Sequence, residues 1–254
     1  MMEPLLKIEG LSKRYPGFCL DGVSFSLAPG RIMGLIGKNG AGKSTTLKAA
    51  LNMVSPQSGT VTMFGQDFYR HEKKCRQRVG VVFGGIDFYP LKRLSTITAV
   101  TRRFFAGWDE ERHRSYLRRF SLDESRKCKE LSNGMKVKYL LALALSHHAE
   151  LLILDEPTSG LDPVSRQELT HIFRHIVKAE GCSILFSTHI TSDLDRCADD
   201  ITYIHNGRVL QSADRETFLR SFDHLKTPDE TGPLPLEEIM LRTERSEWDD
   251  DAAL

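Results

Sequence analysis

Short continuous runs of apolar residues occur along this chain, separated by longer segments with helical periodicity. Runs of this length, bounded by Gly, Pro or polar residues, are typical of strands that are buried on both faces. The runs lie at residues 32–36, 79–83, 151–154 and 183–187. Segments with helical character follow at residues 44–51, 163–180 and 190–197. This alternation predicts an α/β core around a mostly parallel sheet.

A second pattern, in which apolar and polar residues alternate, occurs near the N-terminus. Residues 23–27 place serines between apolar side chains, which predicts a half-buried antiparallel strand. Together with strands expected at residues 5–11 and 60–65, it predicts an N-terminal antiparallel β subdomain. Farther along the chain, apolar stretches flank Asn206-Gly207, and this dipeptide is a signal for a two-residue β-hairpin.

Helical periodicity dominates between residues 88 and 150, where two groups of apolar residues each share one face of a helix. The groups are Ile97, Val100, Phe104 and Phe105, and then Tyr116, Leu117 and Phe120. Arginines between them are expected to point outward. Because strands of the parallel sheet precede and follow this segment, we expect an inserted helical subdomain at about residues 88–150.

The C-terminal part of the chain has a different composition. The apolar core pattern stops, a stretch rich in Pro, Gly and acids follows, and residues 237–254 then contain seven acidic residues against two arginines. Segments of this composition are commonly solvated. We therefore expect a main domain at residues 1–220 and an acidic tail at residues 221–254, with a short docking helix at residues 236–241.

The overall charge is nearly balanced, because 35 basic residues stand against 34 acidic ones and the net charge is +1. This balance gives no indication of a nucleic-acid partner, and none is expected. No run approaches the roughly 18 to 20 consecutive apolar residues that a membrane span needs. The N-terminus lacks the pattern of a signal peptide, and the five cysteines contain no C-x-x-C pair. These features predict a chain that stays in the cytoplasm with reduced thiols.

Residues 37–45 read Gly-Lys-Asn-Gly-Ala-Gly-Lys-Ser-Thr and match the phosphate-loop pattern G-x-x-x-x-G-K-[ST] without a mismatch. A predicted strand precedes the loop and a predicted helix follows it, as this motif requires. The glycines allow positive φ, so backbone N–H groups can turn toward a phosphate at the helix N-terminus. Lys43 is expected to reach the β- and γ-phosphates, and Ser44 to bind Mg²⁺. The predicted nucleotide-binding residues of the loop are Gly37, Lys38, Asn39, Gly40, Ala41, Gly42, Lys43, Ser44 and Thr45.

Two acids and a histidine follow predicted strands farther along. Asp155 suits a Mg²⁺ ligand at the end of an apolar strand, and Glu156 suits a general base that polarises the attacking water. Two adjacent carboxylates repel each other strongly unless a cation lies near them. His189 follows the next strand; a histidine there is usually structural, but beside a phosphate site it can hydrogen-bond the γ-phosphate. The sequence therefore predicts Glu156 as a catalytic residue and Ser44 and Asp155 as metal ligands, and it leaves a structural and a catalytic role open for His189.

An aromatic residue, Tyr15, stands in the segment Lys-Arg-Tyr-Pro-Gly between the first two predicted strands, where we expect a turn. A tyrosine in a turn is commonly a half-exposed surface residue. Its flat face can instead stack on a purine base. The pattern of residues by itself leaves both interpretations open.

Taken in order, these motifs resemble the nucleotide-binding domain of ATP-binding cassette (ABC) transporters, over roughly residues 5–220. The matching motifs are Walker A at residues 37–45, Walker B with its catalytic glutamate at 151–156, the D-loop at 159–162, the switch histidine at His189 and the adenine-stacking aromatic at Tyr15. The resemblance implies a P-loop NTPase fold that binds and hydrolyses ATP with Mg²⁺. It also favours base stacking for Tyr15, a catalytic role for His189 and a nucleotide-binding role for Asp162, the last residue of the D-loop.

Residues 131–135 read Leu-Ser-Asn-Gly-Met and stand where this family has its signature L-S-G-G-Q. Ser132 is expected to cap the helix that follows, which leaves N–H groups and a hydroxyl facing an anion. In the family this anion is the γ-phosphate of ATP held by the other subunit. The resemblance therefore implies a head-to-tail, ATP-dependent dimer with a second ATPase subunit, in which Ser132 and Gly134 contact the nucleotide.

Two features depart from the family pattern. Asn133 and Met135 replace a glycine and the final glutamine of the signature, while Ser132 and Gly134 are kept, so we expect function to survive. Gly84 stands where the family usually has a glutamine that helps to bind Mg²⁺. The resemblance thus leaves open how the metal ligands are completed here.

The resemblance implies an ATPase subunit that drives a separate transmembrane permease subunit from the cytoplasmic side of the cell membrane. The signature variant, the compact helical insertion and the sequence Leu-Glu-Glu-Ile-Met at residues 236–240 look like the bacterial branch that exports drugs, antibiotics and bacteriocin peptides. The alternative is a stand-alone cassette ATPase in assembly or on nucleic acid. The long coiled-coil insertions of chromosome-maintenance relatives do not fit between Ser44 and Asp155. A neighbouring gene for a multi-span protein would favour the transporter hypothesis.

Overall fold

The centre of the molecule is a mixed sheet in the strand order β10-β9-β3-β8-β7-β6, seen in a computed structural model that describes residues 3–83 and 89–251. Its strands are β3 (Ile32–Ile36), β6 (Val79–Phe83), β7 (Leu151–Asp155), β8 (Ser183–Thr188), β9 (Asp200–His205) and β10 (Arg208–Asp214). Neighbouring strands are parallel except for β9 and β10, which form the antiparallel hairpin predicted at Asn206-Gly207. The prediction of a mostly parallel sheet is confirmed.

Both faces of this sheet are buried, which explains why its strands read as continuous apolar runs. Successive side chains of a strand point to opposite faces. Leu151 and Ile153 accordingly belong to one hydrophobic cluster, and Leu152 and Leu154 to the other. All four side chains are fully buried, so β7 is held on both sides and delivers the residues that follow it to a fixed position.

The N-terminal part of the chain forms a second, antiparallel sheet, as predicted, with the strand order β2-β1-β4-β5. Its strands are β1 (Leu6–Tyr15), β2 (Phe18–Leu27), β4 (Ser58–Met63) and β5 (Gln66–Asp67). The prediction that Tyr15 lies in a turn is wrong, because β1 continues to this residue and pairs it with Phe18. Pro16 and Gly17 alone make the turn, and Gly17 has the positive φ of +79° that a glycine adopts without strain.

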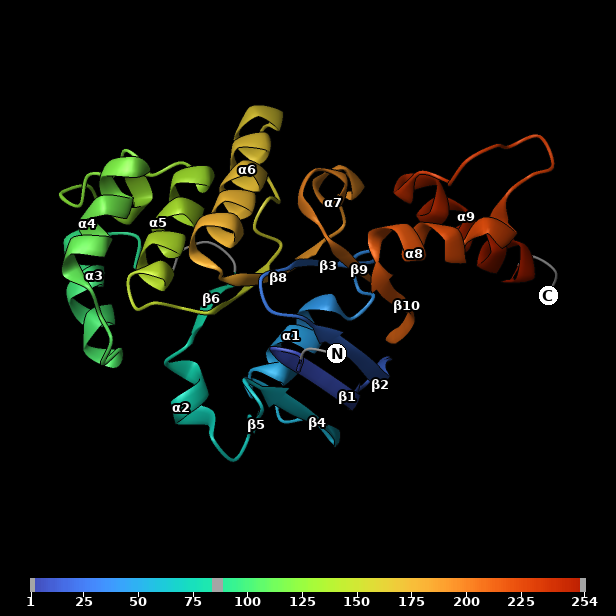
Figure 1. The fold of residues 1–254 in the computed structure, drawn as a ribbon, viewed down its shortest axis with the longest axis horizontal. Helices are drawn as coiled ribbons and strands as arrows, with labels where there is room; N and C mark the ends of the chain where they lie inside the picture. The colour runs from blue at the N-terminus through green and yellow to red at the C-terminus, as the bar shows by residue number, and fades with distance from the viewer. Residues whose placement is uncertain (1–2, 84–88, 252–254) are drawn as a thin grey trace.

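The helices pack mostly on the central sheet, and α1 (Lys43–Ala50) lies between the two sheets. The others are α2 (Glu72–Arg76), α3 (Leu94–Thr101), α4 (Glu110–Arg119), α5 (Asn133–Leu145), α6 (Pro163–Glu180), α7 (Thr191–Cys197), α8 (Arg215–Ser221) and α9 (Leu236–Asp251), with short 3₁₀ turns η1 (Arg102–Phe104), η2 (Cys128–Glu130) and η3 (Asp223–Leu225). Figure 1 shows α3, α4 and α5 together at one end of the molecule, and α8 and α9 at the opposite end. The first group is the predicted helical insertion.

The apolar face predicted for the first helix of this insertion is only partly correct. Ile97 is buried, but Val100 is 50% exposed and Phe104 is 70% exposed. The helical spacing breaks down because α3 ends at Thr101 and continues as η1, which has a tighter winding than an α-helix. Two large apolar side chains are therefore left on the surface.

The C-terminal segment is more ordered than its composition suggests. The expectation that the core pattern stops before it is wrong, because Phe222, Leu234, Leu236 and Ile239 are buried in the same cluster as the central sheet. The predicted short docking helix is α9, and it extends to Asp251. A few apolar residues at helical spacing hold it on the core, although acids dominate the average composition.

We expect Ile239→Ala to lower the free energy of unfolding by about 2 to 5 kcal/mol, as is usual for truncation of a fully buried isoleucine. The matched control on the same helix is Leu241→Ala, since Leu241 is 44% exposed and surface substitutions usually change stability by about 0.5 kcal/mol or less. Urea denaturation followed by circular dichroism measures both. Equal effects of the two variants would show that α9 is not packed in this way.

Candidate active site

The phosphate loop joins β3 to α1 in a conformation that depends on its glycines. Gly40 and Gly42 have φ angles of +85° and +112°, which L-residues with a Cβ rarely adopt. A Cβ built on Gly37 would lie 2.2 Å from the carbonyl oxygen of Ile204. The loop is thus seated directly on β9, and its N–H groups lie at the N-terminus of α1 as an anion site requires.

The side chain of Lys43 is only 5% exposed and is held over this loop. Its Nζ donates hydrogen bonds to the carbonyl oxygens of Gly37 at 2.8 Å and Lys38 at 3.2 Å. It also lies 3.1 Å from Oε1 of Glu156. The ammonium group is therefore fixed between the loop and the carboxylate that follows β7.

Two hydroxyl groups converge on Asp155 at the end of β7. Its Oδ1 accepts hydrogen bonds from Ser44 Oγ at 2.8 Å and from Ser187 Oγ at 2.6 Å. Ser44 and Asp155, predicted as metal ligands, are thus side by side, and a hydroxyl with a carboxylate is a donor set that Mg²⁺ accepts. The sequence analysis missed Ser187, although the parallel register that pairs Asp155 with Ser187 brings the two together.

Glu156 and His189, the predicted catalytic residues, are in direct contact. Nδ1 of His189 lies 2.8 Å from Oε2 of Glu156. The backbone of Glu156 has a φ of +49°, a strained conformation for a residue with a side chain, and such strain is concentrated at functional sites. A hydrogen bond from its N–H to Ser187 Oγ, at 2.9 Å, supports this geometry. The Glu156 carboxylate is therefore held between Lys43 and His189.

A cavity of about 520 Å³ opens above the loop. The residues that line it are Gly17, Phe18, Asn39, Gly40, Gly42, Lys43, Ser44, Thr45 and Glu156. Tyr15 stands outside this lining and is half-exposed, with Nζ of Lys13 5.5 Å from its ring centre. Phe18, which the sequence analysis missed, is nearer to the loop: a Cβ built on Gly42 would lie 2.9 Å from its ring.

Ser132, Gly134 and Asp162 form a separate group at the start of two helices. Oγ of Ser132 accepts from the N–H of Met135 at 3.2 Å and caps α5. Asp162 caps α6 by accepting from the N–H groups of two residues at 3.0 Å. The hydrogen bond from the Ser165 hydroxyl, together with these backbone hydrogen bonds, lowers the pKa of the Asp162 carboxyl. A Cβ on Gly134 would lie 3.8 Å from Ser165 of α6. None of the three is among the residues described as lining the cavity over the phosphate loop.

Comparisons with known proteins decide the family. A family model described as "ABC transporter" matches residues 20–159. The chain belongs to the ABC transporter family. It is an ATP-binding subunit of this family, an ATPase that hydrolyses ATP to power transport.

Two curated relatives support the assignment. The chain is 31% identical to the bacitracin transport ATP-binding protein BcrA of Bacillus licheniformis, covering 89% of this chain and 72% of BcrA. It is 34% identical to the lantibiotic transport ATP-binding protein SrtF of Streptococcus pyogenes, covering 81% of this chain and 89% of SrtF. A solved structure of an ATP-binding subunit of an ABC transporter aligns with a TM-score of 0.81 and 28% identity, over 94% of this chain and 99% of that one.

Buried polar residues next to the D-loop of this ATP-binding cassette form a cluster that the sequence analysis did not predict. Thr158, just after Walker B, donates to Oδ2 of Asp193 at 2.6 Å. Nε of Arg166 on α6 lies 3.9 Å from Oδ1 of the same carboxylate. Burial raises the pKa of Asp193, which is fully enclosed. The cluster connects Walker B, α6 and α7, the helix that follows His189.

Gly84, the position where the family usually has a metal-binding glutamine, lies outside the described residues.

Proposed function

We propose that this cassette hydrolyses ATP with Mg²⁺ to drive a separate transmembrane subunit that exports a peptide or a drug-like compound. The support comes from two relatives, one a transport protein for bacitracin and the other for a lantibiotic. Within residues 3–83 and 89–251, every helix is too short or too polar to span a lipid bilayer. We place the cassette, residues 1–220, and its C-terminal part, residues 221–254, on the cytoplasmic face of the membrane.

The observation that carries the ATPase assignment is the contact of Glu156 with both Lys43 and His189. The loop N–H groups and Lys43 bind the phosphates of ATP, and a bound Mg²⁺ would neutralise charge on the β- and γ-phosphates. Ser44 and Asp155 are the residues that would hold the ion. Glu156 then orients and polarises the attacking water as general base. We assign His189 to the same step: in one tautomer its Nδ1–H orients the Glu156 carboxylate, and in the other its Nε2–H can donate to the γ-phosphate.

We assign Ser132, Gly134 and Asp162 to the nucleotide of a second subunit. One solved ATP-binding cassette of similar fold is dimeric and bound to ADP and Pi, and another is part of an ABC transporter complex. In this chain the capped N-terminus of α5 stands apart from the cavity over its own phosphate loop, and a helix N-terminus favours an anion. A head-to-tail dimer would bring this end to the partner's ATP, so a single chain supplies half of each site.

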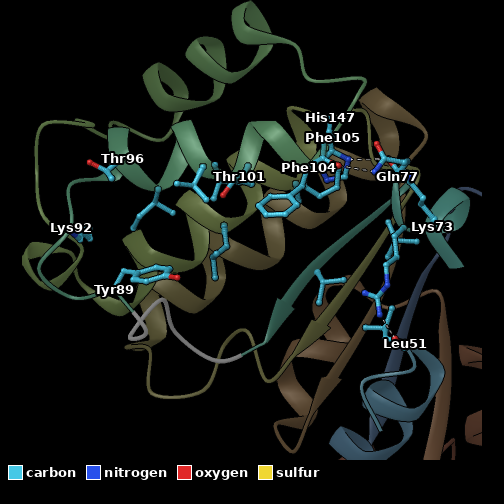
Figure 2. A pocket seen from close by; sticks show the side chains of 18 residues that line it. Leu51, Lys73, Gln77, Tyr89, Lys92, Thr96, Thr101, Phe104, Phe105 and His147 are labelled. Carbon is cyan, nitrogen blue, oxygen red and sulfur yellow. Dashed lines mark hydrogen bonds between the residues drawn. The ribbon is translucent and has the colours of Figure 1, made fainter. Parts of the chain in front are cut away.

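The contact surface for the transmembrane subunit is proposed to be a cavity of about 710 Å³ between the helical insertion and the central sheet. Figure 2 shows side chains converging on it from α2, β6, α3 and α5. Exposed Tyr89, Val100 and Phe104 lie among its lining residues, and large exposed apolar patches mark interaction sites. Lys73 and Lys92 supply positive charge at the same cavity. The occupant we expect is a cytoplasmic segment of the transmembrane subunit with apolar and acidic side chains.

The wall of this cavity is preorganised. The ring of His147 stacks on Phe105 at 3.7 Å between ring centres. Burial lowers the pKa of His147 to about 4, so the imidazole is neutral near pH 7 and suits an apolar partner. The amide of Gln77 donates to the carbonyl oxygen of Phe104 and accepts from the N–H of Ala106, at 2.8 and 2.9 Å. These contacts fix the backbone that presents Phe104.

We expect Phe104→Asp to abolish co-purification with the membrane subunit, while the ATPase rate of the isolated cassette stays within about twofold of wild type. The reason is that Phe104 is 70% exposed and is not among the residues described as lining the cavity over the phosphate loop, and a carboxylate there opposes apolar docking. The measurement is affinity purification from membranes of cells that co-express this chain with a candidate multi-span membrane subunit.

The matched control is Leu210→Asp, at an exposed leucine of β10 that is not among the residues described as lining the cavity. It should keep the association. Retention of the complex by Phe104→Asp would contradict the docking surface. Absence of any complex with the wild-type chain would favour the stand-alone ATPase.

A further inference from the structure

Glu244, on the C-terminal helix α9, reaches back to the phosphate loop. Its Oε2 lies 2.7 Å from Nζ of Lys38, the second residue of the loop, and its Oε1 lies 2.9 Å from Nδ1 of His205 at the end of β9. The side chains of Glu244 and His205 are 15% and 8% exposed, so their contact is largely shielded from water, whereas the Lys38 side chain is 43% exposed and its ion pair with Glu244 is open to solvent on the lysine side. Figure 1 shows α9 beside α8 at the end of the molecule, on the side of the central sheet where β10 lies.

The backbone of Lys38 takes part in two hydrogen bonds within the phosphate loop. Its carbonyl oxygen accepts a hydrogen bond from Nζ of Lys43 at 3.2 Å and another from the N–H of Ala41 at 3.1 Å. The orientation of the Lys38 peptide therefore affects both the turn of the loop and the direction of the Lys43 ammonium group. Glu244 holds the side chain of the residue on which these two bonds depend.

Glu244 also contacts His205, which lies in the chain between two residues that touch the phosphate loop. The residue before it, Ile204, presents the carbonyl oxygen on which Gly37 is seated. Just after it, the N–H of Gly207 donates to the carbonyl oxygen of Ala41 at 2.9 Å. The β9–β10 hairpin thus contacts the phosphate loop at Gly37 and Ala41. The Glu244 carboxylate links this hairpin, through His205, to Lys38 of the loop.

We propose that Glu244 is a positioning residue of the nucleotide site, which makes α9 a working part of that site. Through Lys38 and His205 it holds the phosphate loop against the β9–β10 hairpin in the conformation that binds phosphate. This inference rests on the proposed assignment of residues 37–45 to the phosphates of ATP. It assigns to the C-terminal helix a role in nucleotide affinity that composition alone does not suggest.

The expected result is a change in nucleotide affinity without a change in turnover. Glu244→Gln keeps the size of the side chain but removes the charge that pairs with Lys38. We expect the KM for ATP and the Kd for ADP to rise about threefold to tenfold, the net contribution of one ordinary hydrogen bond. The kcat should stay within about twofold, because neither Glu156 nor His189 touches Glu244. Steady-state ATPase assays and equilibrium titration with a fluorescent ADP analogue measure these quantities.

Two further variants separate positioning from general stabilisation of α9. Glu238→Gln breaks the ion pair of Glu238 with Arg242, 2.6 Å apart on the same helix, and should leave the KM unchanged. Lys38→Met should raise the KM, and adding Glu244→Gln to it should produce little further change if Glu244 acts through Lys38. Thermal denaturation of each variant shows whether it is folded.

The inference is overturned if Glu244→Gln leaves the KM unchanged, lowers it, or raises it no more than Glu238→Gln does. A lower KM would mean that the Glu244 charge chiefly repels the nucleotide. Lys43→Ala in the same titration tests the assignment of the loop separately. Nucleotide affinity that survives Lys43→Ala would refute the proposed site, whereas loss of affinity there with no effect of Glu244→Gln would refute the role of Glu244 alone.

Discussion

Glu156→Gln is expected to bind ATP normally and to hydrolyse it about 10²- to 10⁴-fold more slowly, the usual cost of losing a general base. The amide keeps the size of the carboxylate and can still accept from His189, but it cannot take a proton from water. ATP should then hold a stable dimer, because its hydrolysis no longer releases the two subunits. Steady-state ATPase assays measure the rate, and size-exclusion chromatography with ATP measures the dimer.

The control for this variant is Glu216→Gln, at an exposed glutamate of α8 whose ion pair with Arg220 lies on the surface. It should keep wild-type turnover. Wild-type turnover in Glu156→Gln itself would remove Glu156 from the mechanism and leave its contacts with Lys43 and His189 as structural features.

Ser132→Arg is expected to abolish ATP-driven dimerisation while the isolated chain still binds ATP with nearly wild-type affinity. A bulky cation would replace the cap of α5 at the point where the helix end must meet the partner's phosphate. Loss of the cap itself costs only about 1 kcal/mol of stability, so the chain should remain folded. The assay is sedimentation velocity with ATP in the Glu156→Gln background, together with nucleotide titration of the monomer.

Asp214→Arg provides a matched control, because Asp214 caps α8 by accepting from the N–H of Thr217 at 3.1 Å. This variant loses a comparable cap elsewhere and should still form the dimer. If Ser132→Arg instead destroys ATP binding by the monomer, then Ser132 belongs to the chain's own nucleotide site and its assignment to the partner is wrong.

The parts of this molecule that the sequence predicted are those encoded by neighbouring residues. The phosphate loop is recognisable because its glycines, Lys43 and Ser44 must follow one another to form an anion site at a helix N-terminus. Asp155 and Glu156 are equally local, since a buried strand delivers whatever residues end it. The α/β architecture follows from continuous apolar runs, which only a sheet covered on both faces explains.

The wrong predictions rested on average composition or on local sequence patterns, and not on particular contacts between residues. Helical spacing placed Phe104 on a buried face, but the winding changes at Thr101 and the ring stays exposed. Tyr15 was expected in a turn because of the proline and glycine after it, yet strand pairing continues up to that residue. The acidic average of the C-terminal segment concealed Leu236 and Ile239, which hold α9 on the core.

Contacts between distant segments left no signal that could be read from one sequence. Ser187 meets Asp155 only because their strands are neighbours in register. Lys38 and Glu244 are 206 positions apart, and neither a period nor a motif relates them. Such pairs become visible only when the packing of α9 and the order of the strands are known.

Helix α5 extends from Ser132 to the cavity that we propose for the transmembrane subunit. It packs on β6 so closely that a Cβ on Gly80 would lie 2.5 Å from that of Ala144, and its 13 residues form a rod about 20 Å long. Ser132 caps one end, while Leu140 and Leu143 near the other end line the docking cavity. If Ser132 meets the partner's ATP and the cavity holds the transmembrane subunit, as we propose, this one helix joins the two sites. A kink introduced along α5 would then weaken the connection between ATP and the transmembrane subunit.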